Sequence, residues 1–224
     1  MMRAMALAGL LAACAKPPEE TGPACPHDPS VPREGAVTVQ ATIPPATLRH
    51  DLDLKALAVE SQGTVGFGRL QGLTEVEHRL DVRTLMSLAP SRGRACVWLS
   101  KVTVDLTPGS VVIFVPKEYP EGSCEYDAVL EHERGHERVH RERLEKAAAE
   151  MRAGLDAARW LPLKGNPIEA ADKAAAQAAL EEKIRKVVHP AFEKFKWELT
   201  IAQAELDTPA LYRWVTARCQ DWKK

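Results

Sequence analysis

One uninterrupted helical segment constrains this chain more than any other feature. From Glu125 to Arg152 the sequence lacks proline, consists largely of strong helix formers and follows Ser123, a residue type that caps helix N-termini. The segment contains the run His132-Glu133-Arg134-Gly135-His136. On an α-helix, residues four positions apart lie on the same face, about 6 Å apart along the axis. The sequence therefore predicts a helix with two imidazoles that face the same way.

This His-Glu-x-x-His spacing is typical of a metal site. Zinc binds neutral imidazole nitrogens at about 2.0–2.1 Å, and a catalytic zinc site keeps one coordination position for water. Glu133 directly follows the first histidine, which places its carboxylate beside such a water as a general base. We predict zinc on His132 and His136 with Glu133 as the base. The alternative is a pair of hydrogen-bonded structural histidines.

A third zinc ligand has to come from elsewhere in the chain. His140 lies about 12 Å along the helix axis from His132, too far for two bonds of about 2 Å to one ion. The metzincin pattern needs a histidine six residues after the second ligand, where this chain has Glu142. The sequence does not choose among the remaining candidates, which are Glu181, Glu182, His189, Glu193 and Asp207.

The N-terminus predicts export. Residues 1–13 form a short apolar leader with Arg3 near its start, too short to span a bilayer. Its end, Leu11-Ala12-Ala13-Cys14, resembles the lipobox of bacterial lipoproteins, in which the chain is cut before the cysteine and that cysteine is lipidated. We expect a signal peptide at 1–13, a lipid on Cys14 and a flexible tether at 14–35, which is rich in proline, charge and small residues. The alternative is an alanine-rich terminus with a chance cysteine.

The other four cysteines fit an oxidising compartment, because their number is even and no C-x-x-C metal spacing occurs. Cys96 opens a predicted strand and Cys124 begins the metal helix, so we predict a Cys96–Cys124 disulfide and leave Cys25 with Cys219. The alternative is free buried thiols in a cytosolic protein.

Alternating apolar residues predict strands before the helix. Ala36–Ile43 and Glu75–Leu85 have this pattern, and His78 falls on the half-buried face of the second strand. Leu48–Glu60 fits either a helix or a strand.

Two β-branched runs, Cys96–Leu106 and Val111–Pro116, predict a hairpin with its turn at Thr107–Ser110. The metal helix follows closely, so we expect one of these strands to border the metal site. Its edge could bind an extended peptide, or the protein itself could cover it.

A second helical region, Ile168–Leu206, follows a loop that contains Pro162, Gly165 and Pro167. We expect it to bend or break at His189-Pro190 and to fold back along the metal helix. The residues that it would bury are Leu180, Ile184, Val187, Phe192 and Phe195.

Composition excludes several partners. With 30 Lys and Arg against 31 Asp and Glu, the net charge is −1, which argues against binding to nucleic acid or an anionic membrane surface. Aromatic residues make up only 5%, too few for an aromatic-lined single-strand or carbohydrate groove. The length fits one domain, which we place at 36–160, with a helical extension at 161–224.

The stretch from Gly72 to Leu155 resembles a known family. The resemblance rests on Cys96-Val97-Trp98, on Tyr119-Pro120-Glu121-Gly122-Ser123-Cys124 and on Leu130-Glu131-His132-Glu133-Arg134-Gly135-His136. These motifs are similar to those of uncharacterised bacterial proteins predicted to be secreted zinc-dependent proteases. The resemblance implies an envelope location, zinc on the two histidines and Glu133 as base. Family members often carry Thr-x-His-Gly downstream, whereas this chain has Leu206-Asp207-Thr208-Pro209, so the resemblance supplies no third ligand.

Together these features predict an α+β, zincin-like fold, with a small twisted antiparallel sheet packed on the metal helix and a long helical C-terminal region. We expect zinc-dependent hydrolysis of peptide or protein substrates at the bacterial cell envelope, on the periplasmic or exterior side, with membrane attachment through Cys14. Two alternatives are a non-catalytic envelope lipoprotein that acts as a binding module, with or without zinc, and a hydrolase of another bond.

Overall fold

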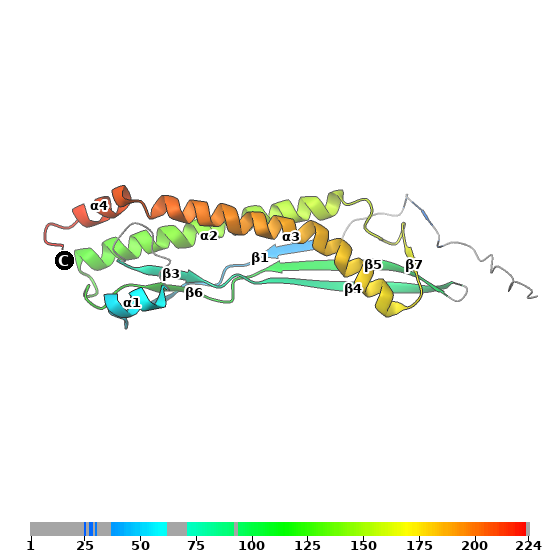
Figure 1. Ribbon diagram of the computed structural model, residues 1–224, viewed down its shortest axis with the longest axis horizontal. Helices are drawn as coiled ribbons and strands as arrows, with labels where there is room; N and C mark the ends of the chain where they lie inside the picture. Colours follow the sequence, from blue (N-terminus) through cyan, green and yellow to red (C-terminus); the bar gives the residue numbers. More distant parts are fainter. Residues whose placement is uncertain are drawn as a thin grey trace, which may run out of the picture.

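Two long helices lie side by side along an extended β-layer in the computed structural model, so the molecule is elongated and has mixed α+β structure (Figure 1). The structure describes residues 25, 27–28, 30, 37–61, 71–91 and 94–222. The predicted signal peptide and the lipidation site Cys14 lie outside the described residues. None of the described helices is long and apolar enough to cross a membrane.

The larger sheet is built around β5 (Arg94–Leu106). β4 (Leu80–Ser91) runs antiparallel to β5 along almost its whole length, from Leu80 opposite Leu106 to Ser91 opposite Arg94. β1 (Val37–Ala41) pairs with the second half of β5 in parallel, and the short β7 (Ile168–Ala170) pairs with its start. The strand predicted at Ala36–Ile43 is thus confirmed.

The smaller sheet has the order β2-β6-β3 and lies beyond the end of the first (Figure 1). β6 (Val111–Phe114) pairs in parallel with β2 (Thr47–Arg49) and antiparallel with β3 (Leu73–Val76). The expectation of one small antiparallel sheet is therefore wrong: the described strands form two sheets, and each contains one parallel pair.

The predicted hairpin is also wrong. Its two runs, in β5 and β6, continue one after the other along the two sheets, and Thr107–Ser110 carries the chain across. Beside this crossing, residues 77–79 carry the chain from β3 to β4, and the Gly109 amide donates to the Glu77 carbonyl at 2.9 Å. The same crossing interrupts the strand predicted at Glu75–Leu85. Pro108 and Gly109 in this segment favour a change in chain direction, but they do not require the second strand to run back along the first.

The metal helix, α2 (Cys124–Ala157), extends the predicted segment slightly at both ends. Ser123 caps it as predicted, because its side chain accepts a hydrogen bond from the Tyr126 amide at 3.1 Å. A shorter helix, α1 (Leu54–Glu60), and strand β2 share the stretch that fitted either a helix or a strand.

The C-terminal region forms α3 (Lys173–Leu206) and α4 (Pro209–Ala217). α3 packs along α2, as expected, but it starts only at Lys173, because Ile168–Ala170 form a strand, β7. The helix is not broken at His189-Pro190, since it continues through Pro190. Pro190 lies on the exposed face of α3, so its ring does not disturb the packing of the helix on the core. Apolar residues on both sides of it, among them Val188 and Phe195, keep the helix attached.

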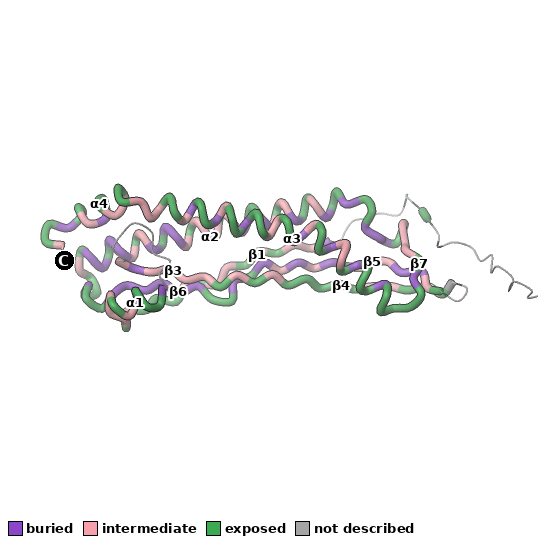
Figure 2. The backbone as a smooth tube through the Cα atoms, in the orientation of Figure 1, coloured by how far each residue is buried: buried purple, intermediate pink, exposed green. Residues whose placement is uncertain are grey.

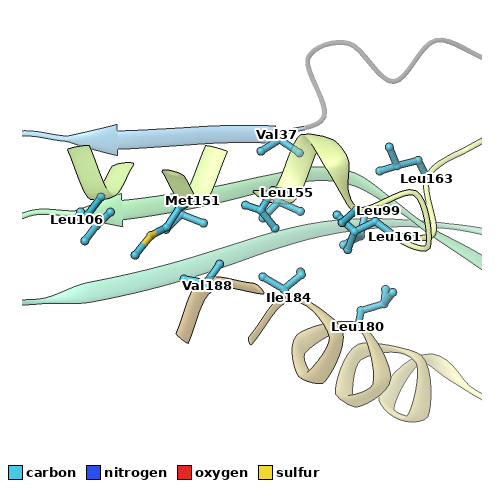
Figure 3. Packing of buried hydrophobic residues seen from close by; sticks show 14 of the residues in the cluster. Val37, Leu99, Leu106, Met151, Leu155, Leu161, Leu163, Leu180, Ile184 and Val188 are labelled. Atoms are coloured by element: carbon cyan, nitrogen blue, oxygen red, sulfur yellow. The ribbon is translucent and has the colours of Figure 1, made fainter. Parts of the chain in front are cut away.

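The main hydrophobic core lies between the larger sheet and the inner faces of α2 and α3, where the buried residues of both helices lie (Figure 2). Met151 and Leu155 of α2 lie beside Leu180, Ile184 and Val188 of α3 (Figure 3). All five are essentially buried, and burying each such side chain contributes about 1.5–3 kcal/mol. The helical extension therefore shares one core with the predicted domain.

Both predicted disulfide pairings are wrong. The disulfides are Cys25–Cys96 and Cys124–Cys219. The predicted Cys96–Cys124 bond required the hairpin, which would have brought the start of β5 to the start of α2. Instead, the Leu99 amide donates to the Pro162 carbonyl, just past the other end of this helix. With 34 residues, α2 is about 50 Å long, so the two cysteines lie far apart.

Part of the predicted tether is attached to the domain. Cys25 is bonded to Cys96, and the Asp28 amide donates to the Gly165 carbonyl at 2.8 Å. His27 contacts the same carbonyl at 2.9 Å. The predicted tether is therefore held against the domain at Cys25 and at Asp28.

Candidate metal centre

Three side chains from two helices converge on one point. Nε2 of His132 and Nε2 of His136 are 3.2 Å apart. Oδ1 of Asp207 lies 3.4 Å from the first nitrogen and 3.2 Å from the second. These three atoms form a group that could hold a metal ion.

The spacing of the three atoms fits one four-coordinate ion. With bonds of about 2.0–2.1 Å, donors at the corners of a tetrahedron are about 3.3–3.4 Å apart. The three measured separations span 3.2–3.4 Å. Three protein donors leave the fourth position free for water or a substrate.

The helices bring these donors together for simple reasons. His132 and His136 are one helical turn apart on α2. Asp207 is the C-cap residue of α3, and Thr208 caps α4. The junction between α3 and α4 therefore lies over the histidine pair and presents its carboxylate to it.

Gln203 fixes the tautomer of His136. Nε2 of Gln203 donates to the backbone carbonyl of His136 at 3.2 Å, which leaves Oε1 of the amide as an acceptor. Oε1 contacts Nδ1 of the imidazole, so Nδ1 carries the proton and Nε2 is free to bind a metal.

Glu133 is buried beside the histidines, at 3% exposure. The Thr74 hydroxyl donates to Oε2 of the glutamate at 2.8 Å. Gly72 packs so closely that a Cβ there would lie 2.6 Å from Oε1. The carboxylate is therefore held in a narrow space and is not one of the three metal-binding groups.

Glu133, His136 and Asp207 line one cavity of about 180 Å³. The strand that borders it is β3, through Leu73 and Thr74. The prediction that a strand of the hairpin borders the metal site is wrong. β3 takes this place because it lies at the edge of the smaller sheet, next to α2.

Tyr212 of α4 completes this group. Its hydroxyl donates to Oδ1 of Asp207 at 2.9 Å, and its ring centroid is 5.5 Å from that of His132. Burial, together with the Asp207 carboxylate, raises the pKa of the Tyr212 hydroxyl. The hydroxyl therefore keeps its proton and acts as a donor.

The charged groups influence one another strongly. Burial opposes ionisation of Asp207, but the hydrogen bonds from His132 and His136 outweigh it and hold the pKa of the carboxyl well below its usual range. Burial also opposes a charged His136, yet the hydrogen bond to Asp207 and the charge of Glu133 raise its pKa to about 9. Burial raises the pKa of Glu133, against the nearby charges of His136 and His132. Without metal, a proton on His136 is thus shared with Asp207.

This proton predicts how metal binding depends on pH. Because the pKa of His136 is raised to about 9, Zn²⁺ must displace one proton at neutral pH, and lower pH strengthens the competition. We expect the Zn²⁺ affinity to rise about tenfold per pH unit between pH 7 and 8.5, with about one proton released. Calorimetry in buffers of different ionisation enthalpy measures both quantities. An affinity that stays constant over this range would contradict a proton on His136 that zinc has to displace.

His140 is not part of the donor group, as predicted from its distance along the helix. Its ring stacks on that of His78, with centroids 5.1 Å apart, and both Nδ1 atoms are buried without a hydrogen bond to any described residue. Burial, with the charges of His78 and His136, lowers the pKa of His140 to about 3. Burial also lowers the pKa of His78. The two histidines are therefore neutral at physiological pH, and the ring of His78 packs edge-on against Phe195.

The structure brings together His132, Glu133 and His136 as predicted and selects Asp207 from the five candidate third ligands. The other candidates, Glu181, Glu182, His189 and Glu193, lie on α3 outside the donor group. Thr74, Gln203 and Tyr212 also belong to the site, but the sequence does not predict them. These residues lie 59, 67 and 5 positions from the residues they contact, and no local motif marks them.

Comparison of the chain with models of protein families, with curated proteins and with solved structures gave no significant match. The resemblance to secreted zinc-dependent proteases therefore stays a prediction, and the case for a function depends on the geometry of the site.

Proposed function

We propose that this protein is a zinc-dependent peptidase of the bacterial cell envelope. The observation that carries the proposal is the convergence of His132, His136 and Asp207 beside a buried, non-ligating Glu133. Two imidazoles and one carboxylate, with one open position, form a donor set typical of catalytic zinc.

The position of Glu133 favours hydrolysis over other metal chemistry. Two histidines and a carboxylate also bind Fe(II) in oxygenases. A general base beside the open position is needed to activate water. Glu133 lines the same cavity as two of the donors, His136 and Asp207, and Thr74 and Gly72 restrict its movement.

The proposed chemistry follows from these positions. Bound zinc would lower the pKa of a water molecule toward 7 and polarise the scissile carbonyl. Glu133 takes a proton from the attacking water and returns it to the leaving amine. Gln203 keeps Nε2 of His136 unprotonated toward the metal, and Thr74 orients the carboxylate of Glu133.

The substrate class follows from strand β3. Among the described residues, β3 pairs only with β6, so no described strand occupies its other edge. Leu73 and Thr74 of this strand line the cavity. An extended peptide could add to this edge and place one of its bonds at the metal. A sheet edge beside a metal-binding helix is also why we propose a zincin-like arrangement.

The two disulfides support the proposed location. Disulfides persist in oxidising compartments such as the bacterial periplasm or the cell surface. A lipid on Cys14 would attach the protein to the membrane. Lipidation of Cys14 stays part of the proposal, because this residue lies outside the described part of the chain.

Metal removal and restoration test the function. We expect protein stripped with a chelator to leave an unfolded protein substrate such as casein intact, and one equivalent of Zn²⁺ to restore cleavage. Mass spectrometry of new N-termini identifies the bonds that are cut. Stoichiometric Zn²⁺ binding without any cleavage, across a broad peptide library, would favour a binding module instead.

A further inference from the structure

The hydroxyl of Tyr212 lies beside the metal-binding atoms without being one of them. It donates to Oδ1 of Asp207 at 2.9 Å, and the ring lies 5.5 Å from that of His132. Tyr212 and Glu133 line the same cavity. A hydrogen-bond donor and a carboxylate acceptor therefore both adjoin the position that the donors leave open.

A ligand in that open position lies within reach of Tyr212. In a four-coordinate site, an oxygen at the fourth corner is about 3.3 Å from each of the three donor atoms. The hydroxyl is already at hydrogen-bond distance from one of them, Oδ1 of Asp207. Because Tyr212 also lines the cavity, rotation about its C–O bond alone, with the ring in place, can turn the hydroxyl hydrogen from the carboxylate toward an oxygen in the cavity.

Contacts between α4 and α2 hold in place the helix that carries Tyr212. Thr208 caps the helix, and Val215 is buried against Ala128 of α2. The Cys124–Cys219 disulfide joins the start of α2 to the residues just after α4. A donor fixed in this way needs little reorganisation when charge develops near it.

We propose that Tyr212 is a catalytic residue that donates a hydrogen bond to the oxyanion formed from the scissile carbonyl. This inference rests on the proposed peptidase function. The water oxygen forms a bond to the carbonyl carbon, and the electron pair of the C=O π bond moves to the carbonyl oxygen. Glu133 accepts the water proton, while Tyr212 keeps its own proton. The electron pair of the oxyanion then re-forms the C=O bond as the C–N bond breaks, and the nitrogen takes the C–N electron pair and the proton held by Glu133.

Tyr212→Phe tests the proposal. We expect kcat for a peptide substrate to fall about a hundredfold, the usual scale for loss of one oxyanion donor. KM should change by less than about threefold. Because Asp207 stays in place, the Zn²⁺ affinity should fall by no more than about tenfold, the lower end of the scale for losing a partner of a ligand, and kcat is measured with zinc at saturation. The affinity for a phosphinic peptide, whose tetrahedral phosphorus group mimics the oxyanion, should fall at least about tenfold when measured by calorimetry. Tyr126→Phe is the control: it removes a hydroxyl from a buried tyrosine on α2 that does not line the cavity.

Three results would overturn this role. If kcat and phosphinic-peptide affinity stay within threefold of wild type, the hydroxyl does not contact the oxyanion. If the Zn²⁺ affinity falls in parallel with kcat, Tyr212 only positions Asp207. If the zinc-loaded wild type neither cleaves peptides nor binds the phosphinic peptide, the peptidase function fails together with this inference. If the wild type cleaves peptides normally and Tyr212→Phe is unaffected, only the role of Tyr212 is rejected and the peptidase function stands.

Discussion

Replacing Glu133 by Gln is expected to lower the hydrolysis of an unfolded protein substrate at least about a hundredfold while zinc binding stays stoichiometric. The scale is that of a lost general base. Gln keeps the size of the side chain and can still accept the hydrogen bond from Thr74, which now reaches Oε2 at 2.8 Å. The fold and the three metal-binding residues should therefore be unchanged. Initial rates, zinc content and the free energy of unfolding are measured on the same preparation.

Glu142→Gln is the matched control, because Glu142 is an exposed glutamate on the same helix. Its rate should stay within about twofold of wild type. Equal rates for Glu133→Gln and wild type would remove the general base from the mechanism and, with it, the main reason to infer hydrolysis.

Replacing Asp207 by Ala should weaken zinc binding at least about a hundredfold and abolish hydrolysis. Even residues that only support a ligand contribute about 10–100-fold to metal affinity, and Asp207 is expected to bind the ion directly. The two histidines that remain cannot hold zinc well, because structural and catalytic zinc sites use three or four protein ligands. Competition with a chromophoric chelator measures the affinity.

Glu205→Ala provides the comparison for this variant. Glu205 is an exposed carboxylate two residues before Asp207 on α3, so its loss should leave the zinc affinity unchanged. If Asp207→Ala binds zinc as tightly as wild type, the third ligand has been assigned to the wrong residue.

Local features of the sequence predicted the helices and the paired histidines well. The α2 segment combines a capping serine, strong helix formers and the four-residue spacing of His132 and His136, all within one continuous stretch. Helical hydrogen bonds and side-chain neighbours are local, so such a stretch specifies both its structure and the face on which the imidazoles lie. The packing of α3 on α2 followed from apolar residues such as Leu180 and Ile184 in the same way.

Strand pairing and disulfides were predicted poorly because they depend on contacts between distant parts of the chain. β1 pairs with β5 across more than sixty residues, and Cys25 pairs with Cys96 across 71. The β-branched runs before and after Thr107–Ser110 indicate strands but not their partners. One wrong hairpin then gave a wrong disulfide, since the hairpin placed Cys96 at the wrong end of α2.

The third ligand shows the same limit at the site. Asp207 was one of the five candidate ligands on the C-terminal region, and nothing around it in sequence separates it from Glu193 or His189. Its position depends on where α3 ends, and on the register in which α3 packs on α2. That register places Gln203 against His136 and Asp207 one turn further, over the histidine pair.

The most direct test of this account is anomalous X-ray diffraction at the zinc absorption edge from crystals of the zinc-loaded wild-type protein. We predict one strong peak about 2.0–2.2 Å from Nε2 of His132, Nε2 of His136 and Oδ1 of Asp207, with the carboxylate of Glu133 facing the open position but not bound to the metal. If other residues hold the zinc, or if this site stays empty although zinc was added in excess, the result contradicts the metal centre and the function derived from it.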